Sequence, residues 1–219
     1  MITFEDIRSN PKVKVFIERG NDVLGVMGYT EHSFQHAMRT SETAANILSL
    51  LEYSQRDIEL VKIAAFMHDI GNVVNRVDHA HSGALMAFQI LNELYMDPNE
   101  IASVISAIGN HDEATSMPVN SIAAALILAD KSDVRRSRVR NPEFSTFDIH
   151  DRVNYAVKES KIVIDADKKT ASLELQIDSS ICSVMDYFEI FLTRMILCRR
   201  AAEFLGLKFE LLINKMRLL

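Results

Sequence analysis

The sequence has few of the residues that break a chain into loops. Only 7 glycines and 4 prolines occur among its 219 residues, and 48% of the residues are hydrophobic. A chain this rich in apolar residues can bury a sizeable core, which argues against intrinsic disorder. Its length fits one large domain, or a domain with a small appendage.

Cysteine and basic charge are also scarce. The chain has two cysteines and no Cys-x-x-Cys pair, so we expect Cys182 and Cys198 to be small buried thiols in a reducing cytosol. Lys and Arg total 24 against 30 Asp and Glu, which gives a formal net charge of −6. Without an excess of cations to replace counterions, a general nucleic-acid coat is excluded, whereas a local basic patch stays open.

Long apolar runs are missing as well. The longest clean run covers residues 122–129 and is ended by Asp130, far short of the ~20 residues that a bilayer crossing needs. The first residues show no basic segment followed by an apolar core, so no secretory signal is visible. We therefore expect a soluble, cytoplasmic protein with no membrane partner.

The spacing of apolar residues predicts an α-helical body up to about residue 140. Helices are expected over residues 31–52, over about 58–67, from near Ala80 to 94, after residue 97, and over 121–137. Gly71 is the expected stop of the second of these helices. The clearest helix start is at residues 97–100, where Asp97 can accept from a free amide and Glu100 can close a capping box.

After Pro142 the pattern changes to a mixture of helix and strand. A short helix near residues 149–156 precedes two β-prone runs, 161–165 and 173–177, which flank a polar turn and predict a hairpin. The tail from about residue 180 returns to helix. We thus predict a mainly α fold, a helical bundle over residues 1–140, with a C-terminal α+β appendage over 141–219 packed on it. The apolar residues of this tail are Phe188, Phe191, Met195 and Leu205. We expect them to pack against the core of their own domain, and formation of a homodimer is the alternative.

Seven histidines against two cysteines direct attention to imidazole and carboxylate chemistry. His68 and Asp69 end an apolar run, and Asp130 ends another. Such groups are costly to bury without a partner, and facing helices of a bundle can supply the ligands of a metal. Taken alone, a His-Asp pair or an Asp after an apolar run more often marks a surface, helix-end or hydrogen-bonded group than a metal ligand. His32 and His36 lie four residues apart and form a rival chelating pair, while His150 has no functional interpretation.

The order of these residues along separate helices resembles the HD-domain superfamily of metal-dependent phosphohydrolases, helical proteins named for their His-Asp pair. The resemblance covers about residues 30–140. Residues 68–71, His-Asp-Ile-Gly, and 128–131, Leu-Ala-Asp-Lys, look like stretches of that family. Residues 79–84 are similar to a segment in which a histidine precedes Gly-Ala by four positions.

The resemblance implies a set of metal ligands. Two further histidines, which hold a second ion in some members, are matched by His79 and His111, the latter within a His-His-Glu-like segment that starts with Asn110 here. We favour His79 over His81, because its distance to Gly-Ala fits and the two cannot share one helical face. The minimal site, which holds one metal, would be His36, His68, Asp69 and Asp130.

Imidazoles and carboxylates together suit divalent Fe, Mn, Zn or Ni, and we expect two ions. Asp69 is the natural bridge, because two metals can each take one of its oxygens. Two cations roughly 3.5–4 Å apart would stabilise the attacking and leaving oxygens of a phosphoryl displacement and lower the pKa of a bridging water. His68 and Asp69 are therefore the predicted catalytic residues. Walker and Gly-x-Gly-x-x-Gly patterns are absent, and no nucleophilic triad competes.

Residues 131–140 hold five basic residues and one acid directly after Asp130. They are either a solvated helix end, where cations suit the dipole, or a phosphate-binding rim in which Lys131 and Arg135 contact substrate if the helix continues. Many relatives carry a phosphate-contacting lysine where this chain has Asn72, so the substrate contacts must differ. The Gly-Tyr-Pro motif of cyclic-di-GMP phosphodiesterases is absent after His111.

The leading hypothesis is a phosphohydrolase that attacks a nucleotide or another small phosphate ester with a metal-activated water. Two alternatives stay open, an HD-type di-iron oxygenase and a non-catalytic, metal-stabilised binding or regulatory module.

Overall fold

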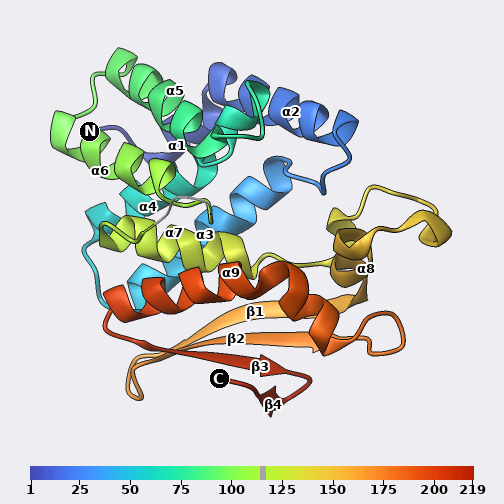
Figure 1. The fold of residues 1–219 in the computed structure, drawn as a ribbon. Helices are drawn as coiled ribbons and strands as arrows, with labels where there is room; N and C mark the ends of the chain where they lie inside the picture. Colours follow the sequence, from blue (N-terminus) through green and yellow to red (C-terminus); the bar gives the residue numbers. More distant parts are fainter. Residues whose placement is uncertain (114–116) are drawn as a thin grey trace.

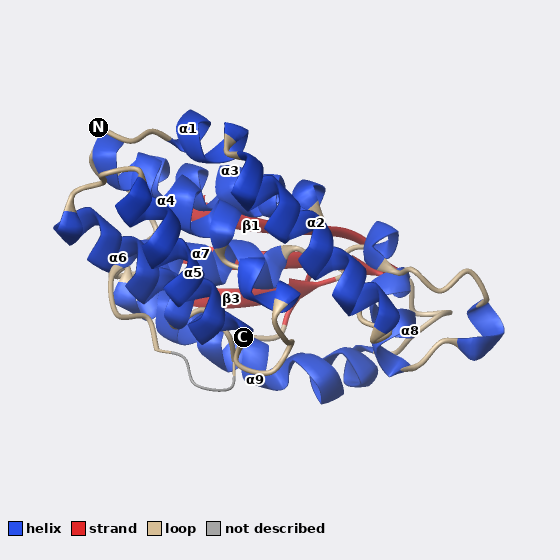
Figure 2. Cartoon of the chain, turned by 90° about the horizontal axis from the view of Figure 1, so that it is seen from above, coloured by secondary structure: helices blue, strands red, loops and turns tan. Residues whose placement is uncertain are grey.

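The computed structural model describes residues 1–113 and 117–219. Its larger part is a layer of helices (Figure 1), and Figure 2 shows these helices lying over the strands. The elements of this layer are α1 (Phe4–Ser9), α2 (Pro11–Val26), α3 (Phe34–Leu50), α4 (Gln55–Met67), the 3-10 turn η1 (Ile70–Val73), α5 (His79–Glu93), α6 (Pro98–Gly109) and α7 (Ser121–Ser132).

The C-terminal part adds a small sheet and two helices. Its elements are the 3-10 turns η2 (Arg136–Arg138) and η3 (Phe144–Thr146), then α8 (Ile149–Ala156), β1 (Val157–Asp165), β2 (Thr170–Ile177), α9 (Val184–Phe204), β3 (Lys208–Ile213) and β4 (Met216–Arg217). The prediction of a mainly α fold with a C-terminal α+β appendage is confirmed.

The predicted hairpin forms, within a larger sheet than expected. β1 and β2 pair in antiparallel fashion, while β3 runs parallel to β2, so that the strand order is β1-β2-β3-β4. A parallel pair needs a long crossover, and α9 provides it between β2 and β3. Strand β3 is not among the predicted elements, although Phe209, Leu211 and Ile213 alternate with more exposed residues there and are buried.

Helix α7 is buried on all sides. It packs against α3, α4 and α6 on one side, and against α9 and β1 on the other. Every residue from Ile122 to Ala129 is at most 3% exposed, as expected of a helix that is apolar around its whole circumference. This helix therefore carries Asp130, in its last turn, into the interior of the molecule.

Two expectations about helix ends are wrong: the capping box of Glu100 and the position where α7 ends. The helix start at Asp97 is as predicted, since its Oδ1 accepts from the backbone amide of Asn99 at 2.9 Å. Glu100 makes no capping box and instead accepts from Arg56 Nε of α4 at 2.6 Å. Helix α7 ends at Ser132 and not near residue 137, because Ser132 Oγ donates to a carbonyl of the last turn and Asp133 turns its side chain to α3.

One hydrophobic core runs through both parts of the chain, from Ile7 of α1 to Ile213 of β3. Helix α9 contributes Phe191 and Met195 to this core, as expected for a wall of its own domain, and a homodimer stays a proposal. The boundary near residue 140 also stays a prediction. Cys182 and Cys198 are buried free thiols. Among the described residues, no helix has both the length and the apolar character needed to span a membrane.

Candidate metal centre

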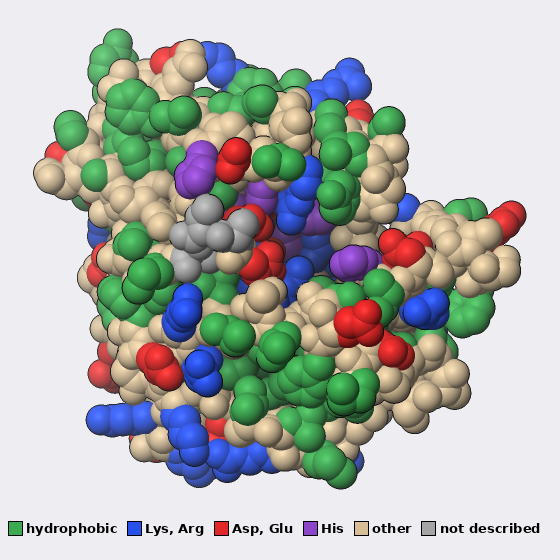
Figure 3. All heavy atoms as spheres, in the orientation of Figure 1, with side chains coloured by type: hydrophobic (Ala, Val, Ile, Leu, Met, Phe, Trp, Pro, Cys, Tyr) green, Lys and Arg blue, Asp and Glu red, His purple; other side chains and the backbone are tan. Residues whose placement is uncertain are grey.

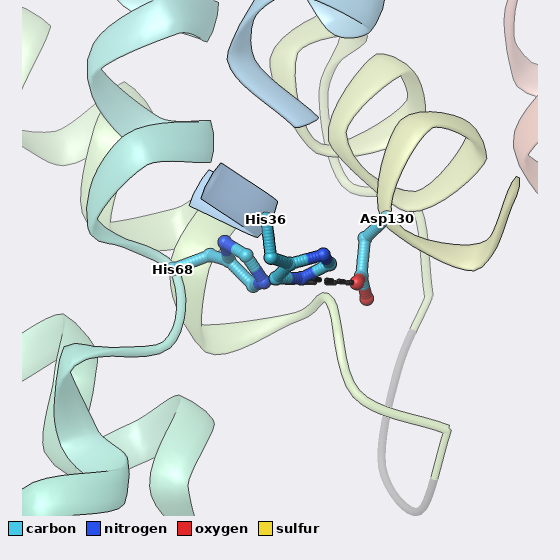
Figure 4. Close-up of side chains that lie close together, drawn as sticks. All are labelled: His36, His68 and Asp130. Atoms are coloured by element: carbon cyan, nitrogen blue, oxygen red, sulfur yellow. Dashed lines mark ion pairs between the residues drawn. The ribbon is translucent and has the colours of Figure 1, made fainter. Parts of the chain in front are cut away.

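Three helix ends bring the first group of donors together. His36 lies in the first turn of α3, His68 follows α4, and Asp130 lies in the last turn of α7. Figure 4 shows the two imidazoles pointing toward the carboxylate of Asp130. His36 Nε2 and His68 Nε2 lie 3.3 Å and 3.6 Å from Asp130 Oδ1. Residues far apart in sequence thus direct their ligand atoms at one point.

A second group lies on the other side of Asp69. His79 starts α5 and His111 follows α6. His79 Nε2 is 3.3 Å from Asp69 Oδ1 and 3.2 Å from His111 Nε2, and His111 Nε2 is 4.0 Å from the same Asp69 oxygen. Asp69 Oδ2 instead faces His68 Nε2 at 3.1 Å and His36 Nε2 at 3.7 Å. The two oxygens of Asp69 therefore face different histidine pairs.

The other ring nitrogen of each histidine is anchored to the protein. His36 Nδ1 donates to Asp133 Oδ2 at 2.7 Å. The Nδ1 atoms of the other three bind backbone carbonyls at 2.6–3.0 Å, His68 that of Ala65, His79 that of Arg76 and His111 that of Ile108. In the neutral form of each ring, such outer contacts favour the tautomer that leaves Nε2 with its lone pair. All four Nε2 atoms are thereby prepared to act as ligands.

Several of these inward-facing atoms lack a hydrogen bond. His36 Nε2, His68 Nε2 and Asp69 Oδ2 are buried without a partner among the described residues. Leaving a buried polar atom unsatisfied costs about 1–3 kcal/mol, and a divalent cation would satisfy all three at once. Within residues 1–113 and 117–219, two sets of residues could hold an ion, one of His36, His68 and Asp130 and one of His68, Asp69 and His111. Donors of this kind suit Fe, Mn, Zn or Ni, so the residues fit a metal.

The charges within the cluster shift its pKa values strongly. Burial opposes the charged form of His68, but the carboxylates of Asp69 and Asp130 outweigh it and raise the pKa of His68 to about 10. Burial likewise raises the pKa of Asp130, yet Lys131 and the imidazoles hold it well below its usual range. Burial also raises the pKa of Asp69, but His68 and His79 hold it well below its usual range, so both carboxylates are ionised at neutral pH. A metal that binds His68 must displace its proton.

A cavity of about 480 Å³ opens from these donors to solvent. Figure 3 shows it as a hollow in which histidine, acidic and basic side chains gather. Asp69, His79, His111 and Asp130 line its inner end. Helices α8 and α9 form part of its wall. The cations that line it are Arg76, Lys131, Arg138 and Arg194.

Of the two residues expected to contact substrate, Lys131 lines the cavity and Arg135 does not. Lys131 lines the cavity, with Nζ 2.8 Å from Asp130 Oδ2 and 3.4 Å from Glu113 Oε1. Arg135 is not among the described residues that line it. Because α7 ends at Ser132, Arg135 turns away and pairs with Asp133 and Glu31. The expectation for Arg135 depended on a continuing helix and is not supported by its position.

The three remaining histidines lie in different places, one in solvent and two at the cavity. His81 turns to solvent with 55% of its side chain exposed and pairs with Asp78, so the structure brings His79 and not His81 to the centre. His32 lines the cavity beside the first donor group, its ring 5.5 Å from that of His36. His150 lines the cavity as well, although the sequence assigned it no functional part.

Several polar residues that line the site or orient its donors have no predicted role from the sequence, among them Arg76, Glu113, Asp133 and Arg194. Asp133 lies one helical turn beyond Asp130, a spacing that could have suggested it as a partner of a ligand. Arg194 on α9 binds Glu113 Oε1 at 2.9 Å, a contact across the fold without any local signal. Burial raises the pKa of Glu113, but Lys131 and Arg194 lower it well below its usual range.

Known proteins resemble this chain in sequence and in structure. The family model described as HD domain matches residues 33–172. A relative described as an uncharacterized protein, from Methanocaldococcus jannaschii, is 27% identical over 195 residues, which cover 78% of this chain and 74% of that protein. A crystal structure described as a predicted HD superfamily hydrolase, from an uncultured Thermotogales bacterium, shares 26% identity with a TM-score of 0.44 and covers 57% of this chain and 67% of that one. Since the family model spans well over half of the sequence and includes the His68-Asp69 pair, the chain belongs to the HD domain family.

Proposed function

We propose that this protein is a metal-dependent phosphohydrolase that cleaves a nucleotide or another small phosphate ester. The observation that carries the proposal is a cation-lined cavity that ends at Asp69 and Asp130, beside the buried Nε2 atoms of His36 and His68, which have no hydrogen-bond partner among the described residues. Metal ligands and anion-binding side chains lie in one concave site, as hydrolysis of a phosphate ester requires.

In this proposal, His36, His68, Asp69 and Asp130 hold one divalent ion. Asp69, His79 and His111 would hold a second ion, an assignment supported by the two oxygens of Asp69 facing different histidine pairs. Bound ions would act as Lewis acids and lower the pKa of a water nucleophile toward neutrality. His68 and Asp69 are the catalytic residues in this assignment.

The cations of the cavity would offset the charge of the phosphate group. Lys131 is buried beside Asp130 and Glu113, whose carboxylates outweigh burial and raise its pKa, so it stays charged. Arg76 and Arg194 present planar guanidinium groups, which suit the oxygens of a phosphate. The cavity volume lies in the range of about 300–1,000 Å³ that is common for sites of small ligands.

A phosphate-release screen on purified protein loaded with Mn²⁺, Fe²⁺, Zn²⁺ or Ni²⁺ tests this proposal. We expect wild-type protein to release phosphate from at least one small ester, and His68→Ala to fall to the background of protein-free buffer. His81→Ala is the matched control, because it removes a solvent-exposed histidine outside the centre. Equal activity of wild type and His68→Ala would contradict the proposal.

The same protein can separate the two alternatives. Iron-dependent oxygen uptake with an added substrate would favour an oxygenase, whereas phosphate release with Mn²⁺ under strict anaerobiosis excludes oxygen as a reactant. Metal binding with no turnover across a broad panel of phosphate esters would favour a binding or regulatory module.

A further inference from the structure

Arg76 lies directly against the second histidine pair. Its Nη1 is 3.3 Å from His79 Nε2 and 3.4 Å from Asn72 Oδ1, and its Nη2 is 3.9 Å from Asp112 Oδ1. The guanidinium also lies over the ring of Tyr29, with 5.7 Å between Cζ and the ring centroid. It is partly exposed and lines the cavity. A positive charge thus stands where His79 would bind a metal.

The acceptor atoms around this position require a cation. Because the Nδ1 atoms of His79 and His111 are bound to backbone carbonyls, both Nε2 atoms carry lone pairs, and they face each other at 3.2 Å. Neither can donate to the other, and Asp69 Oδ1 adds a third acceptor at 3.3 Å from His79 Nε2. Arg76 offers this group an N–H donor and a positive charge.

One lone pair serves one partner. His79 Nε2 can accept from Arg76 or coordinate a metal ion, but it cannot do both. We propose that Arg76 controls occupation of the second metal position, and that an anion bound in the cavity opens this position by drawing the guanidinium away from His79. This inference rests on the metal centre of the proposed function and adds a means by which ligand binding regulates it.

The contacts of Arg76 favour such an exchange. Its hydrogen-bond distances to His79 and Asn72 are long for N–H donors, and its ion pair with Asp112 is longer still. A phosphate group would offer the guanidinium two short, charge-assisted hydrogen bonds at once. By linkage, an anion that raises the affinity of the second metal gains affinity from that metal by the same factor.

The test is a count of bound Mn²⁺ per chain by equilibrium dialysis and elemental mass spectrometry, without and with inorganic phosphate. Wild-type protein should fill one position at low Mn²⁺ and the second only at higher Mn²⁺, and phosphate should shift the second step to lower Mn²⁺. In Arg76→Met, which keeps an unbranched side chain at this position but removes the charge, we expect the second ion to bind roughly tenfold more tightly without phosphate. Added phosphate should then change little.

Arg136→Met is the matched control, because it also removes an arginine stacked on a tyrosine, 4.3 Å from the centroid of Tyr155, but outside the cavity. It should titrate like wild type. Equal second-step affinities in wild type and Arg76→Met would overturn the role of Arg76, as would a single ion per chain in both. Absence of any bound ion in all three proteins would instead overturn the metal centre itself. Circular dichroism melting curves would show that each variant is folded.

Discussion

At the residue scale, each metal-ligand candidate depends on a second residue that orients it. Asp133 is the clearest case: it is 7% exposed, accepts from His36 Nδ1 at 2.7 Å, and is held by the Nε atoms of Arg39 and Arg135 at 3.2 Å and 3.0 Å. Burial raises the pKa of Asp133, but the interaction with His36 and the nearby arginines lowers it well below its usual range. The carboxylate is therefore ionised whenever the protein is folded near neutral pH.

Asp133→Asn should weaken metal binding about 10- to 100-fold, the usual cost of losing an outer-shell partner. The amide cannot accept from the histidine and from both arginines at once, so the His36 ring loses its fixed orientation. Isothermal titration with Mn²⁺ measures the effect. Asp167→Asn, at the exposed turn between β1 and β2, is the control. An unchanged affinity in Asp133→Asn would show that this carboxylate does not orient His36.

The buried thiol of Cys198 is expected to reduce the stability of the fold at alkaline pH. Burial raises the pKa of Cys198 to about 12, against about 8.5 for an unfolded thiol. A pKa raised in the folded state contributes stability that is complete below about pH 8.5 and is lost as the pH approaches 12. Urea unfolding at pH 7.5 and pH 10 should show a larger loss of stability in wild type than in Cys198→Ala. Equal losses in both proteins would contradict this origin of alkaline sensitivity.

At the element scale, the site depends on the close approach of η1 to the first turn of α5. A Cβ on Gly71 would lie 2.5 Å from Gly83 N and 2.6 Å from Ser82 Oγ, and it would also clash with the carbonyl of His79. Two backbones therefore touch at this point, which explains why a glycine follows the His-Asp pair. The contact sets the position of His79 relative to Asp69.

Gly71→Ala should destabilise the protein by at least about 1–3 kcal/mol, the usual cost of overpacking, because α5 must move away from η1. It should also weaken binding of the second metal ion, since His79 moves with α5. Denaturant unfolding and a Mn²⁺ titration measure the two effects. The control is Gly109→Ala, whose new Cβ would meet, among the described residues, Ala84 Cβ alone, at 3.7 Å. A stable Gly71→Ala protein with wild-type metal binding would contradict this explanation.

Elements with local signals were predictable from the sequence. The helical spacing of apolar residues indicated α4 and α7, and alternation around a polar turn indicated the β1-β2 hairpin. The predicted end of α7 lies beyond the observed one, because the side chain of Asp133 turns to contact α3. No local pattern in the sequence indicates that contact. Strand β3 was also missed, because it is short and its pairing partner β2 is separated from it along the chain by α9. The pairing therefore depends on contacts between residues distant in sequence.

At the scale of the whole molecule, the chain is acidic but its cavity collects cations from separate parts of the fold. Arg76 precedes α5, Lys131 ends α7, Arg138 follows in η2, and Arg194 belongs to α9. The five basic residues after Asp130 pointed to this chemistry, but only Lys131 and Arg138 of that run line the cavity. Sequence order could not reveal that α9 supplies another cation.

Arg194→Met tests the contribution of α9. The variant removes a charge-assisted hydrogen bond to Glu113, of a kind worth about 1.5–3 kcal/mol, together with a cation that faces the cavity. In the phosphate-release assay we expect KM to rise about tenfold or more while kcat falls less. Arg199→Met, five residues further along α9 and more than half exposed, is the control. A kcat loss at unchanged KM would place Arg194 in the chemical step and not in anion binding.

The metal centre itself is tested most directly by anomalous scattering from crystals of the protein grown with Mn²⁺ or Zn²⁺ and phosphate. The predicted result is one ion between His36, His68, Asp69 and Asp130, and a second on Asp69, His79 and His111. Anomalous peaks elsewhere, or none at these histidines under saturating metal, would contradict the metal centre and the function built on it.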